Sequence, residues 1–390
     1  MRIIFLSNYM SHHQYFLSEE LYKKTNGEYT FIATEPITEE RIKLGWPKIE
    51  APYIIELTEK NEKDILSMIM EADVVIIGSA PYRLVKKRIR AGKLTFTYGE
   101  RPYKKEPSLL TLLVHRLRYT SQYHYPNVYR LCASAFSPLD YARTNTFVGK
   151  SYRWGYFPEV KVYDNFESMY NNKIPNSILW CGRLIDWKHP EVAVSVAKRL
   201  KDEGIAFKMD IIGSGYMYEE IAELIKSQKL DSEVTLHSSM TPDKIREYME
   251  KSSIYLFTSD RQEGWGAVLN EAMNSGCAVV ANSAIGAVPF LLKDKVNGYI
   301  YEDGDINQAS NIVKELIQDK KVKSQISSNA YHSITSTWNS HVAADRLIQL
   351  IEALQNKTCT CIFREGPCSV APVLEDNWYK KSKNNEGSNY

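Results

Sequence analysis

The chain has 390 residues, of which 44% are hydrophobic and 25% are charged, the balance of an ordinary folded protein. This length allows two or three domains, and the composition excludes a mainly disordered chain. No run reaches the ~18 consecutive apolar residues that a membrane-spanning helix needs, and the apolar run at the start is too short for a signal peptide. The six cysteines do not suggest a disulfide framework. We therefore expect a cytoplasmic protein.

The net charge of +2 conceals a strongly basic region in the first half of the chain. Residues 80–150 contain 14 Lys and Arg against 3 Asp and Glu, a local charge of +11, and the excess is densest at residues 83–90. Seventeen of the 26 tyrosines lie in residues 1–170. A region of this charge indicates an anionic neighbour, such as a membrane surface, nucleic acid or phosphate-bearing substrate, unless it is simply a solvated helix face.

Strand-like runs alternate with helix-length amphipathic segments from the start of the chain, which predicts an α/β fold with parallel strands. The strands expected in the first half are 3–7, 29–33, 73–77 and 94–98, and the helices are 14–24, 60–72 and the basic segment 81–91. We expect residues 1–160 to form a basic, tyrosine-rich, Rossmann-like domain that binds the acceptor. The polar residues 161–176 predict a linker.

The alternation then restarts and predicts a second parallel sheet. Its expected strands are 177–181, 208–212, 234–236, 254–257 and 278–281, and the helices are 190–203, 218–229, 242–251, 267–275, 306–319 and 342–354. We expect a second Rossmann-like domain at 177–335, a helix at 336–355 that crosses back to the first domain, and a mostly disordered tail at 356–390. Two such sheets in tandem predict an interdomain cleft at the carboxyl ends of their strands.

The most informative segment follows an expected buried strand and enters a helix. The backbone amides over the start of that helix belong to Gly264, Trp265, Gly266 and Ala267. Amides in such a position favour a phosphate group. Glu263 precedes them and Glu271 lies eight residues further, roughly 12 Å of helical rise. Each carboxylate can hold a vicinal diol, so the pattern fits a nucleotide-sugar with its sugar at Glu263 and its ribose at Glu271.

Glu263, seven intervening residues and Glu271 resemble the E-x7-E signature of retaining glycosyltransferases with the two-domain GT-B architecture, the group 1 or family 4 type. Four further segments resemble motifs of that family in the same order. They are the Arg and Lys loop at 182–188, the glycine turn Gly213-Ser214-Gly215, the turn at 284–289 with one glycine replaced, and the N-G-hydrophobic strand at 296–300. The resemblance covers about residues 177–305.

Three segments of the first half, at 9–14, 131–138 and 154–159, resemble a bacterial subgroup associated with capsule, exopolysaccharide and other surface polysaccharides. The resemblance implies retaining transfer of a sugar from a nucleotide diphosphate donor, a UDP-sugar, to a growing glycan. The basic first half suggests that this glycan is lipid-linked at the inner face of the membrane, and we expect no nucleic-acid partner.

The same resemblance implies the roles of the site residues. Arg183 and Lys188 would neutralise the departing diphosphate without a metal, and no cofactor is expected because the nucleotide-sugar is itself a substrate. Glu263 would hold the transferred sugar. The remaining donor-binding residues would be Glu271, Gly213, Ser214, Gly215 and the four amide-bearing residues above.

Four side chains of the first half are candidates for the acceptor side of the cleft. His12 and His13 follow the first strand, where a capping or turn role is the alternative. Glu100 and Arg101 follow the strand 94–98, at a place where related enzymes often carry His or Asp, so this chain departs from the pattern. His115 is expected to be structural.

The cysteines near the end of the chain do not predict a zinc site. Cys359, Cys361 and Cys368 supply only three thiols, and zinc would need a fourth ligand. We expect these cysteines to be free.

Two other classes of function stay open from the sequence. One is a nucleotide-sugar-binding protein with this fold and no turnover, against which the intact acidic and basic site residues argue. The other is a different enzyme on the same fold, such as a sugar-nucleotide epimerase or a phosphorylase. A nicotinamide-dependent dehydrogenase is disfavoured because the turn at 8–14 lacks G-x-G-x-x-G.

Overall fold

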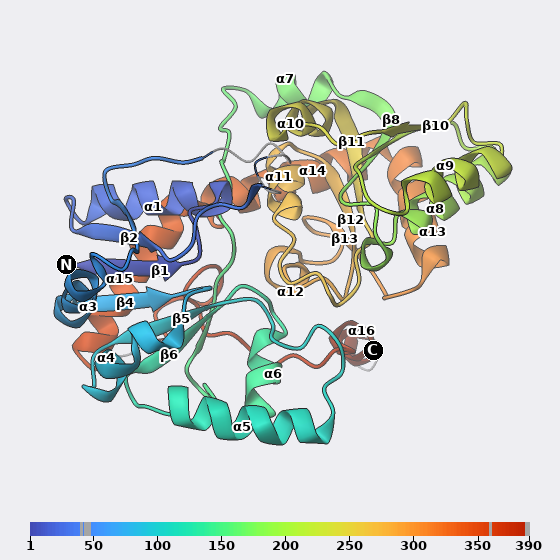
Figure 1. Ribbon diagram of the computed structural model, residues 1–390. Helices are drawn as coiled ribbons and strands as arrows, with labels where there is room; N and C mark the ends of the chain where they lie inside the picture. The colour runs from blue at the N-terminus through green and yellow to red at the C-terminus, as the bar shows by residue number, and fades with distance from the viewer. Residues whose placement is uncertain (40–41, 43–47, 359–360, 387–390) are drawn as a thin grey trace. The chain divides into compact units, whose positions relative to one another are not determined.

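The computed structural model describes residues 1–39, 42, 48–358 and 361–386. It contains two compact units (Figure 1): the first comprises Met1–Glu159 and Thr337–Glu375, and the second Val160–Ser336 and Asp376–Tyr390. Each unit is built on one sheet whose neighbouring strands are all parallel. The predicted α/β class with two Rossmann-like domains is confirmed.

The sheet of the first unit has the strand order β3-β2-β1-β4-β5-β6-β7. Its strands are β1 Ile3–Ser7, β2 Tyr29–Ala33, β3 Ile54–Glu56, β4 Val74–Ile77, β5 Thr95–Gly99, β6 Val128–Cys132 and β7 Ser151–Arg153. Its helices are α1 His12–Lys24, α3 Glu62–Glu71, η1 Tyr82–Leu84, α4 Lys86–Arg90, α5 Leu109–Tyr123, α6 Ser137–Ala142 and α15 Ser340–Gln355. The strand order reverses between β1 and β4, and ligands of such sheets bind at the carboxyl ends of strands beside this switch.

The sheet of the second unit has the order β10-β9-β8-β11-β12-β13. Its strands are β8 Ile174–Cys181, β9 Lys208–Ile212, β10 Val234–His237, β11 Ser252–Phe257, β12 Ala278–Asn282 and β13 Tyr299–Tyr301. Its helices are α7 Phe166–Asn171, η2 Asp186–Lys188, α8 Pro190–Asp202, α9 Tyr218–Ser227, α10 Pro242–Lys251, α11 Val268–Asn274, α12 Val288–Leu291, α13 Ile306–Gln318, α14 Lys320–Ser336 and α16 Trp378–Glu386.

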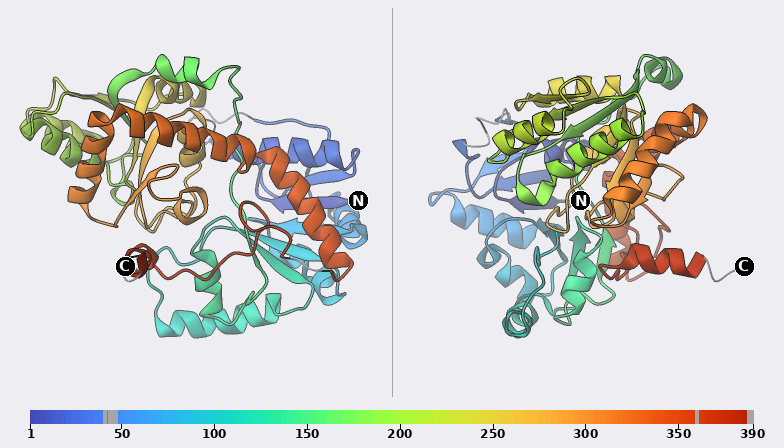
Figure 2. Two further views of the ribbon diagram at one scale, coloured as in Figure 1. Left: turned by 180° about the vertical axis from the view of Figure 1, so that it is seen from behind. Right: turned by 90° about the vertical axis from the view of Figure 1, so that its right-hand side faces the viewer.

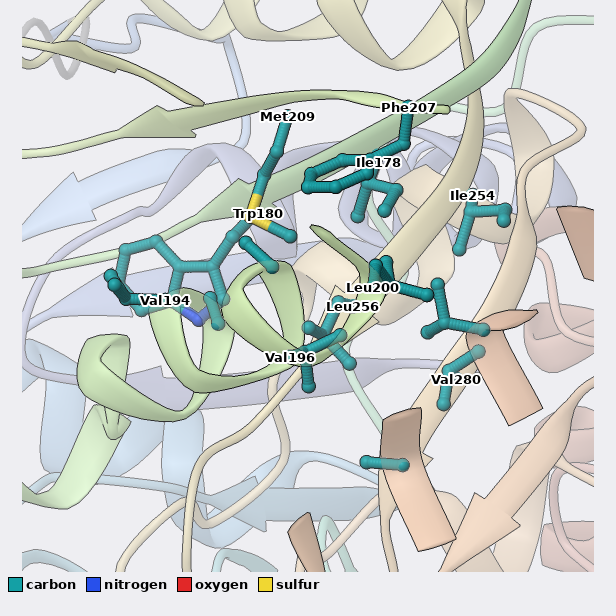
Figure 3. Packing of buried hydrophobic residues seen from close by; sticks show 14 of the residues in the cluster. Ile178, Trp180, Val194, Val196, Leu200, Phe207, Met209, Ile254, Leu256 and Val280 are labelled. Carbon is teal, nitrogen blue, oxygen red and sulfur yellow. The ribbon is translucent and has the colours of Figure 1, made fainter. Parts of the chain in front are cut away.

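The core of the second unit lies between its sheet and the helices that cover it (Figure 3). Every residue of β11 is buried, as expected for a central parallel strand that is covered on both faces. The residues labelled in the close-up are Ile178, Trp180, Val194, Val196, Leu200, Phe207, Met209, Ile254, Leu256 and Val280. This packing makes β8 and β11 a rigid base for the loops at their carboxyl ends.

Helix α15 belongs to the first unit, although it follows the second unit's α14 in the chain. It runs beside α1, as the view from behind shows (Figure 2). Lys24 of α1 pairs with Asp345 of α15 at 2.7 Å, and Glu20 accepts a hydrogen bond from His341 at 2.8 Å. These partly exposed pairs add little stability by themselves, so the buried apolar face of α15 holds the two helices together.

The segment after α15 is packed against the first unit, so the prediction of a disordered tail at 356–390 is wrong for the residues that the structure describes. Val370 forms an antiparallel bridge with Tyr152 of β7, and the Cys368 N–H donates to the Arg153 carbonyl at 2.8 Å. Cys368 is fully buried. The reason is that β7 is an edge strand, whose open backbone groups are satisfied by a further extended segment.

The end of the same tail packs on the second unit through α16. Trp378 Nε1 donates to the Ser283 carbonyl at 3.0 Å, and the Tyr379 hydroxyl donates to the Ile300 carbonyl at 2.5 Å. Tyr379 is buried. Two adjacent aromatic side chains therefore anchor a segment whose overall composition is polar. The five cysteines that the structure describes are free; Cys359 lies outside the described residues.

The expected linker at 161–176 is instead part of the second unit, where it carries α7 and the start of β8. Lys173 is buried and its ammonium group donates to the carbonyl oxygens of Met249 and Ser252 at 2.9 and 2.8 Å. The polar residues that suggested a linker are used to satisfy backbone groups of the unit.

The basic helix expected at 81–91 is broken into η1 and α4, and its charge is not all at the surface. Arg88 is fully buried and donates to the carbonyl oxygens of Ile69 and Ala72 at 2.6 and 2.8 Å. Desolvation lowers the pKa of its guanidinium to about 10. The interpretation of residues 83–90 as a surface that faces an anionic partner is therefore wrong for Arg88. In the described part of the chain, no helix has the length and hydrophobicity of a membrane span.

Candidate functional site

The candidate donor site is built where the carboxyl end of β11 meets the short helix η2. Thr258 lies directly after β11; its hydroxyl donates to the Lys188 carbonyl at 2.6 Å and accepts from Trp180 Nε1 at 2.7 Å. The Asp260 N–H donates to the Trp187 carbonyl at 3.0 Å. These bonds join the two loops, so the residues that they carry have a fixed separation.

Lys188 and Glu263 form an ion pair at this junction. Their side chains are only 14% and 11% exposed, and the Lys188 ammonium group also lies 4.7 Å from the centre of the Trp187 ring. A carboxylate at this depth would be costly without a cation beside it. Arg183 remains exposed, and its guanidinium carbon lies 5.3 Å from the centre of the same ring. The structure thus brings together the three residues predicted to be catalytic.

Glu271 lies in the first turn of α11 and is half-buried. Burial raises the pKa of its carboxyl group, and the nearby Arg246 opposes that rise. Burial likewise raises the pKa of Tyr255 well above its ordinary value, with further contributions from Cys181, Glu271 and Glu263. Both glutamates therefore lie close enough to Tyr255 to affect the pKa of its hydroxyl.

The predicted phosphate-binding segment lies between these two acids. In the described residues, the backbone N–H groups of Gly264, Gly266 and Ala267 have no hydrogen-bond acceptor. Gly266 has φ of +88°, and a Cβ there would lie 2.6 Å from the Phe257 ring, so only glycine fits. Trp265 is fully buried, and its carbonyl accepts the Ala287 N–H at 3.2 Å, so this residue anchors the segment to the second unit.

The glycine turn at residues 213–215 packs directly on the loop that carries Arg183. The Leu184 N–H donates to the Ser214 carbonyl at 2.8 Å, and the Gly182 N–H donates to the Ile212 carbonyl at 3.1 Å. A Cβ at Gly213 would overlap the Gly182 carbonyl oxygen. The glycine turn therefore supports the Arg183 loop, whatever contact it makes with a donor.

We expect Gly213→Ala to lower the free energy of unfolding by about 2 kcal/mol or more, because the added methyl group overlaps the backbone. Gly182→Ala, in the loop that packs on this turn, is the matched control, since the nearest atom to its Cβ would be 3.4 Å away in the Trp180 ring. Urea unfolding measures both. Equal stability of the two variants would contradict the packing role.

His189 connects η2 to the loop before Glu263, a role that sequence reasoning missed. Its Nδ1 contacts Glu191 Oε1 at 2.7 Å and its Nε2 lies 3.5 Å from Asp260 Oδ2. The Asp260 carbonyl in turn accepts the Glu263 N–H at 3.0 Å. The hydrogen bonds to Asp260 and Glu191 raise the pKa of His189 from 6.5 to about 10. In the sequence, this role is indicated only by the position of His189 in a polar stretch after the expected strand 177–181.

The pKa of His189 predicts a pH dependence of stability. The pKa of His189 is higher in the folded state than in the unfolded state. The contribution of its protonated ring to the free energy of unfolding is therefore fully present below about pH 6.5 and is lost as the pH rises through about 10. We expect the difference in unfolding free energy between the wild type and His189→Gln to shrink over this window, as measured by urea unfolding. His124→Gln, a substitution at an exposed position, is the control, and its free energy of unfolding should change with pH as that of the wild type does.

The first unit gathers three of its four predicted acceptor residues near the carboxyl ends of β1 and β5. The His12 and His13 rings lie 3.8 Å apart, and the His13 ring stacks on Tyr156 at 5.9 Å. The Tyr156 hydroxyl donates to Glu100 Oε1 at 3.0 Å, and Glu100 Oε2 accepts from Lys104 at 2.7 Å. Tyr156, which the sequence did not single out as a site residue, links the histidines to Glu100.

Arg101 does not belong to this group, and its prediction as a cleft residue is wrong. Its guanidinium is fully buried and makes two hydrogen bonds to Asp140, at 3.1 and 3.0 Å, and lies 5.0 Å from the centre of the Phe136 ring. The side chain points into the core because Asp140 on α6 offers a bidentate partner there. His115 is structural as expected, since its Nδ1 contacts the Tyr103 hydroxyl at 3.0 Å.

Comparison with solved structures identifies the class of fold. Anabaena Alr3699/HepE, solved in complex with UDP, aligns with a TM-score of 0.69 over 90% of this chain and 100% of its own, at 15% identity. The fold is that of the GT-B glycosyltransferases. Residues 164–333 match the family Glycosyl transferases group 1, so this chain carries a group 1 glycosyltransferase domain, and the predicted resemblance is confirmed.

Curated relatives match just under half of the chain. The amylovoran biosynthesis glycosyltransferase AmsK of Erwinia amylovora is 28% identical over 46% of this chain and 45% of its own length. The N-acetylgalactosamine-N,N'-diacetylbacillosaminyl-diphospho-undecaprenol 4-alpha-N-acetylgalactosaminyltransferase of Campylobacter jejuni is 28% identical over 45% and 46%. The matches therefore span just under half the length of these relatives.

Proposed function

We propose that the protein is a retaining glycosyltransferase that moves a sugar from a UDP-sugar to a growing surface glycan. The observation that carries the proposal is the Lys188–Glu263 ion pair beside the exposed Arg183, with Glu271 in the first turn of α11. The group 1 domain at residues 164–333 supports a nucleotide-sugar as the donor. UDP is favoured because Alr3699/HepE was solved with it.

In this proposal the sugar binds at Glu263, the diphosphate faces the amides of residues 264–267, and the ribose binds at Glu271. The bond from the anomeric carbon to the phosphate oxygen breaks, and the acceptor oxygen forms a new bond on the same face of the sugar. Arg183 and Lys188 neutralise the charge that develops on the diphosphate. The acceptor proton passes to the departing phosphate oxygen, so no strong enzymatic base is needed.

The acceptor is proposed to be a lipid-linked glycan at the inner face of the cytoplasmic membrane, approached by the basic first unit. The printed name of the Campylobacter jejuni relative specifies a diphospho-undecaprenol acceptor, and AmsK is an amylovoran biosynthesis enzyme. His12, His13 and Glu100 are the proposed contacts for the acceptor. A panel of UDP-, GDP- and ADP-sugars, read as released nucleotide, tests the donor; no release from any of them would refute the proposal.

We expect Arg183→Ala to lower kcat by roughly a hundredfold or more, because a preorganised cation is lost where charge develops. Arg183 is the informative position since it is exposed, whereas removal of Lys188 would leave Glu263 buried without its partner. Steady-state nucleotide release measures the effect. Arg199→Ala, a substitution of an arginine on α8, is the matched control, and an almost fully active Arg183→Ala would refute the role.

The two cations also lead us to propose that turnover needs no metal. Among the described residues, no group of three or more His, Cys, Asp or Glu could hold a metal ion. We expect the initial rate of nucleotide release to be unchanged by EDTA and by added Mg²⁺ or Mn²⁺. A loss of activity in EDTA that Mn²⁺ restores would contradict metal independence and leave the transferase reaction itself in place.

A further inference from the structure

Helix α5 of the first unit has an apolar face that the protein does not cover. None of its 15 residues is buried. The exposed apolar residues are Leu109 (86% exposed), Leu110 (70%), Leu113 (56%), Val114 (53%) and Leu117 (68%). Positions 110, 113, 114 and 117 recur at intervals of three and four, so they form one stripe along the helix. Soluble proteins rarely leave such a continuous stripe in water.

The opposite face of α5 holds the helix on the first unit, so the stripe is not the result of a loose helix. His115 Nδ1 contacts the Tyr103 hydroxyl at 3.0 Å, and the Tyr119 ring lies 5.3 Å from that of Tyr141 on α6. Figure 1 shows α5 at the edge of the first unit, with α6 next to it. Ser108 caps the helix by accepting the Thr111 N–H at 3.1 Å. The polar and aromatic face points inward and the apolar face points outward.

Basic residues flank the stripe, and α5 contains no acidic residue. Arg116 and Arg118 are exposed on the helix, and Lys105 is exposed in the loop before it. The nearby Glu106 pairs with Arg143 at 3.0 Å, which reduces its opposing charge. Apolar side chains bordered by arginine are the pattern of a helix that lies in the interface of a bilayer, with its charged groups at anionic headgroups.

We propose that α5 docks the protein on an anionic lipid bilayer, with the stripe at the acyl boundary and Arg116 and Arg118 on lipid phosphates. A second copy of the chain is a less favourable partner for this stripe. A symmetric contact would bring Arg116 and Arg118 close to the same arginines of the other copy, and like charges repel. A bilayer is fluid, so it can cover a single protruding helix without a surface of complementary shape. This proposal rests on the proposed function, because a lipid-linked acceptor is the reason for the protein to approach a membrane. It adds that α5 is the element that contacts the bilayer.

The test is sedimentation with vesicles of phosphatidylcholine, with or without phosphatidylglycerol, at low salt and without donor or acceptor. We expect the wild type to bind the anionic vesicles preferentially. The double variant Leu113→Gln, Leu117→Gln should bind them about tenfold more weakly or worse, because apolar insertion is lost. Arg116→Glu with Arg118→Glu should remove the preference for anionic lipid. Val162→Gln, at a residue that is 78% exposed elsewhere, is the matched control.

Absence of binding by the wild type, or equal binding by the leucine variant and the Val162→Gln control, would overturn the proposal. So would a wild-type dimer in analytical ultracentrifugation that the leucine substitutions dissociate. Nucleotide release from a soluble donor, measured on the same preparations, separates this proposal from the function. Release without vesicle binding refutes only the docking role of α5, and vesicle binding without release from any donor refutes only the transferase.

Discussion

The Lys188–Glu263 ion pair is the interaction on which the candidate site depends. Both side chains are largely buried, and a single buried charge without its partner would be unfavourable. Each partner comes from a different loop, so the pair can form only because the backbone and Thr258 bonds between η2 and the end of β11 place those loops together. The acid and the cation are thus positioned as one unit before any ligand is present.

A second constraint is the close approach of backbone to backbone at Gly213. The loop with Arg183 lies directly on the glycine turn, and the carbonyl of Gly182 occupies the space that any side chain at residue 213 would need. The loop that carries Arg183 is held on one side by this turn and on the other by the start of η2, and the Arg183 side chain remains exposed. Rigid support behind a charged side chain favours the preorganisation that electrostatic stabilisation of a leaving group requires.

The first unit uses its basic residues in two different ways. Arg88 and Arg101 are buried and satisfy carbonyl or carboxylate oxygens of the core, whereas Arg116 and Arg118 are exposed on α5. A count of charges in the sequence cannot separate these uses, because both contribute equally to the +11 of residues 80–150. Within residues 83–90 only Arg88 is buried, whereas Arg83, Lys86, Lys87 and Arg90 are exposed, so this segment and α5 both present positive charge at the surface of the first unit.

The sequence by itself determined the alternation of strands and helices and the order of the site motifs. The bounds of β1, β2, β9 and α10 coincide with the predicted ranges, because hydrophobic periodicity and turn residues act over short distances along the chain. The spacing of Glu263 and Glu271 around the start of α11 is likewise local in the sequence.

Only the tertiary structure decided which polar residues serve the core and which face outward. Arg101 meets Asp140 and His13 meets Tyr156, and the residues of each pair are far apart in the sequence. The same holds for the extended segment at Val370 on the edge of β7 and for the outward face of α5. In each case the outcome depends on which partner the fold brings within a few ångströms, and no local pattern of residues carries that information.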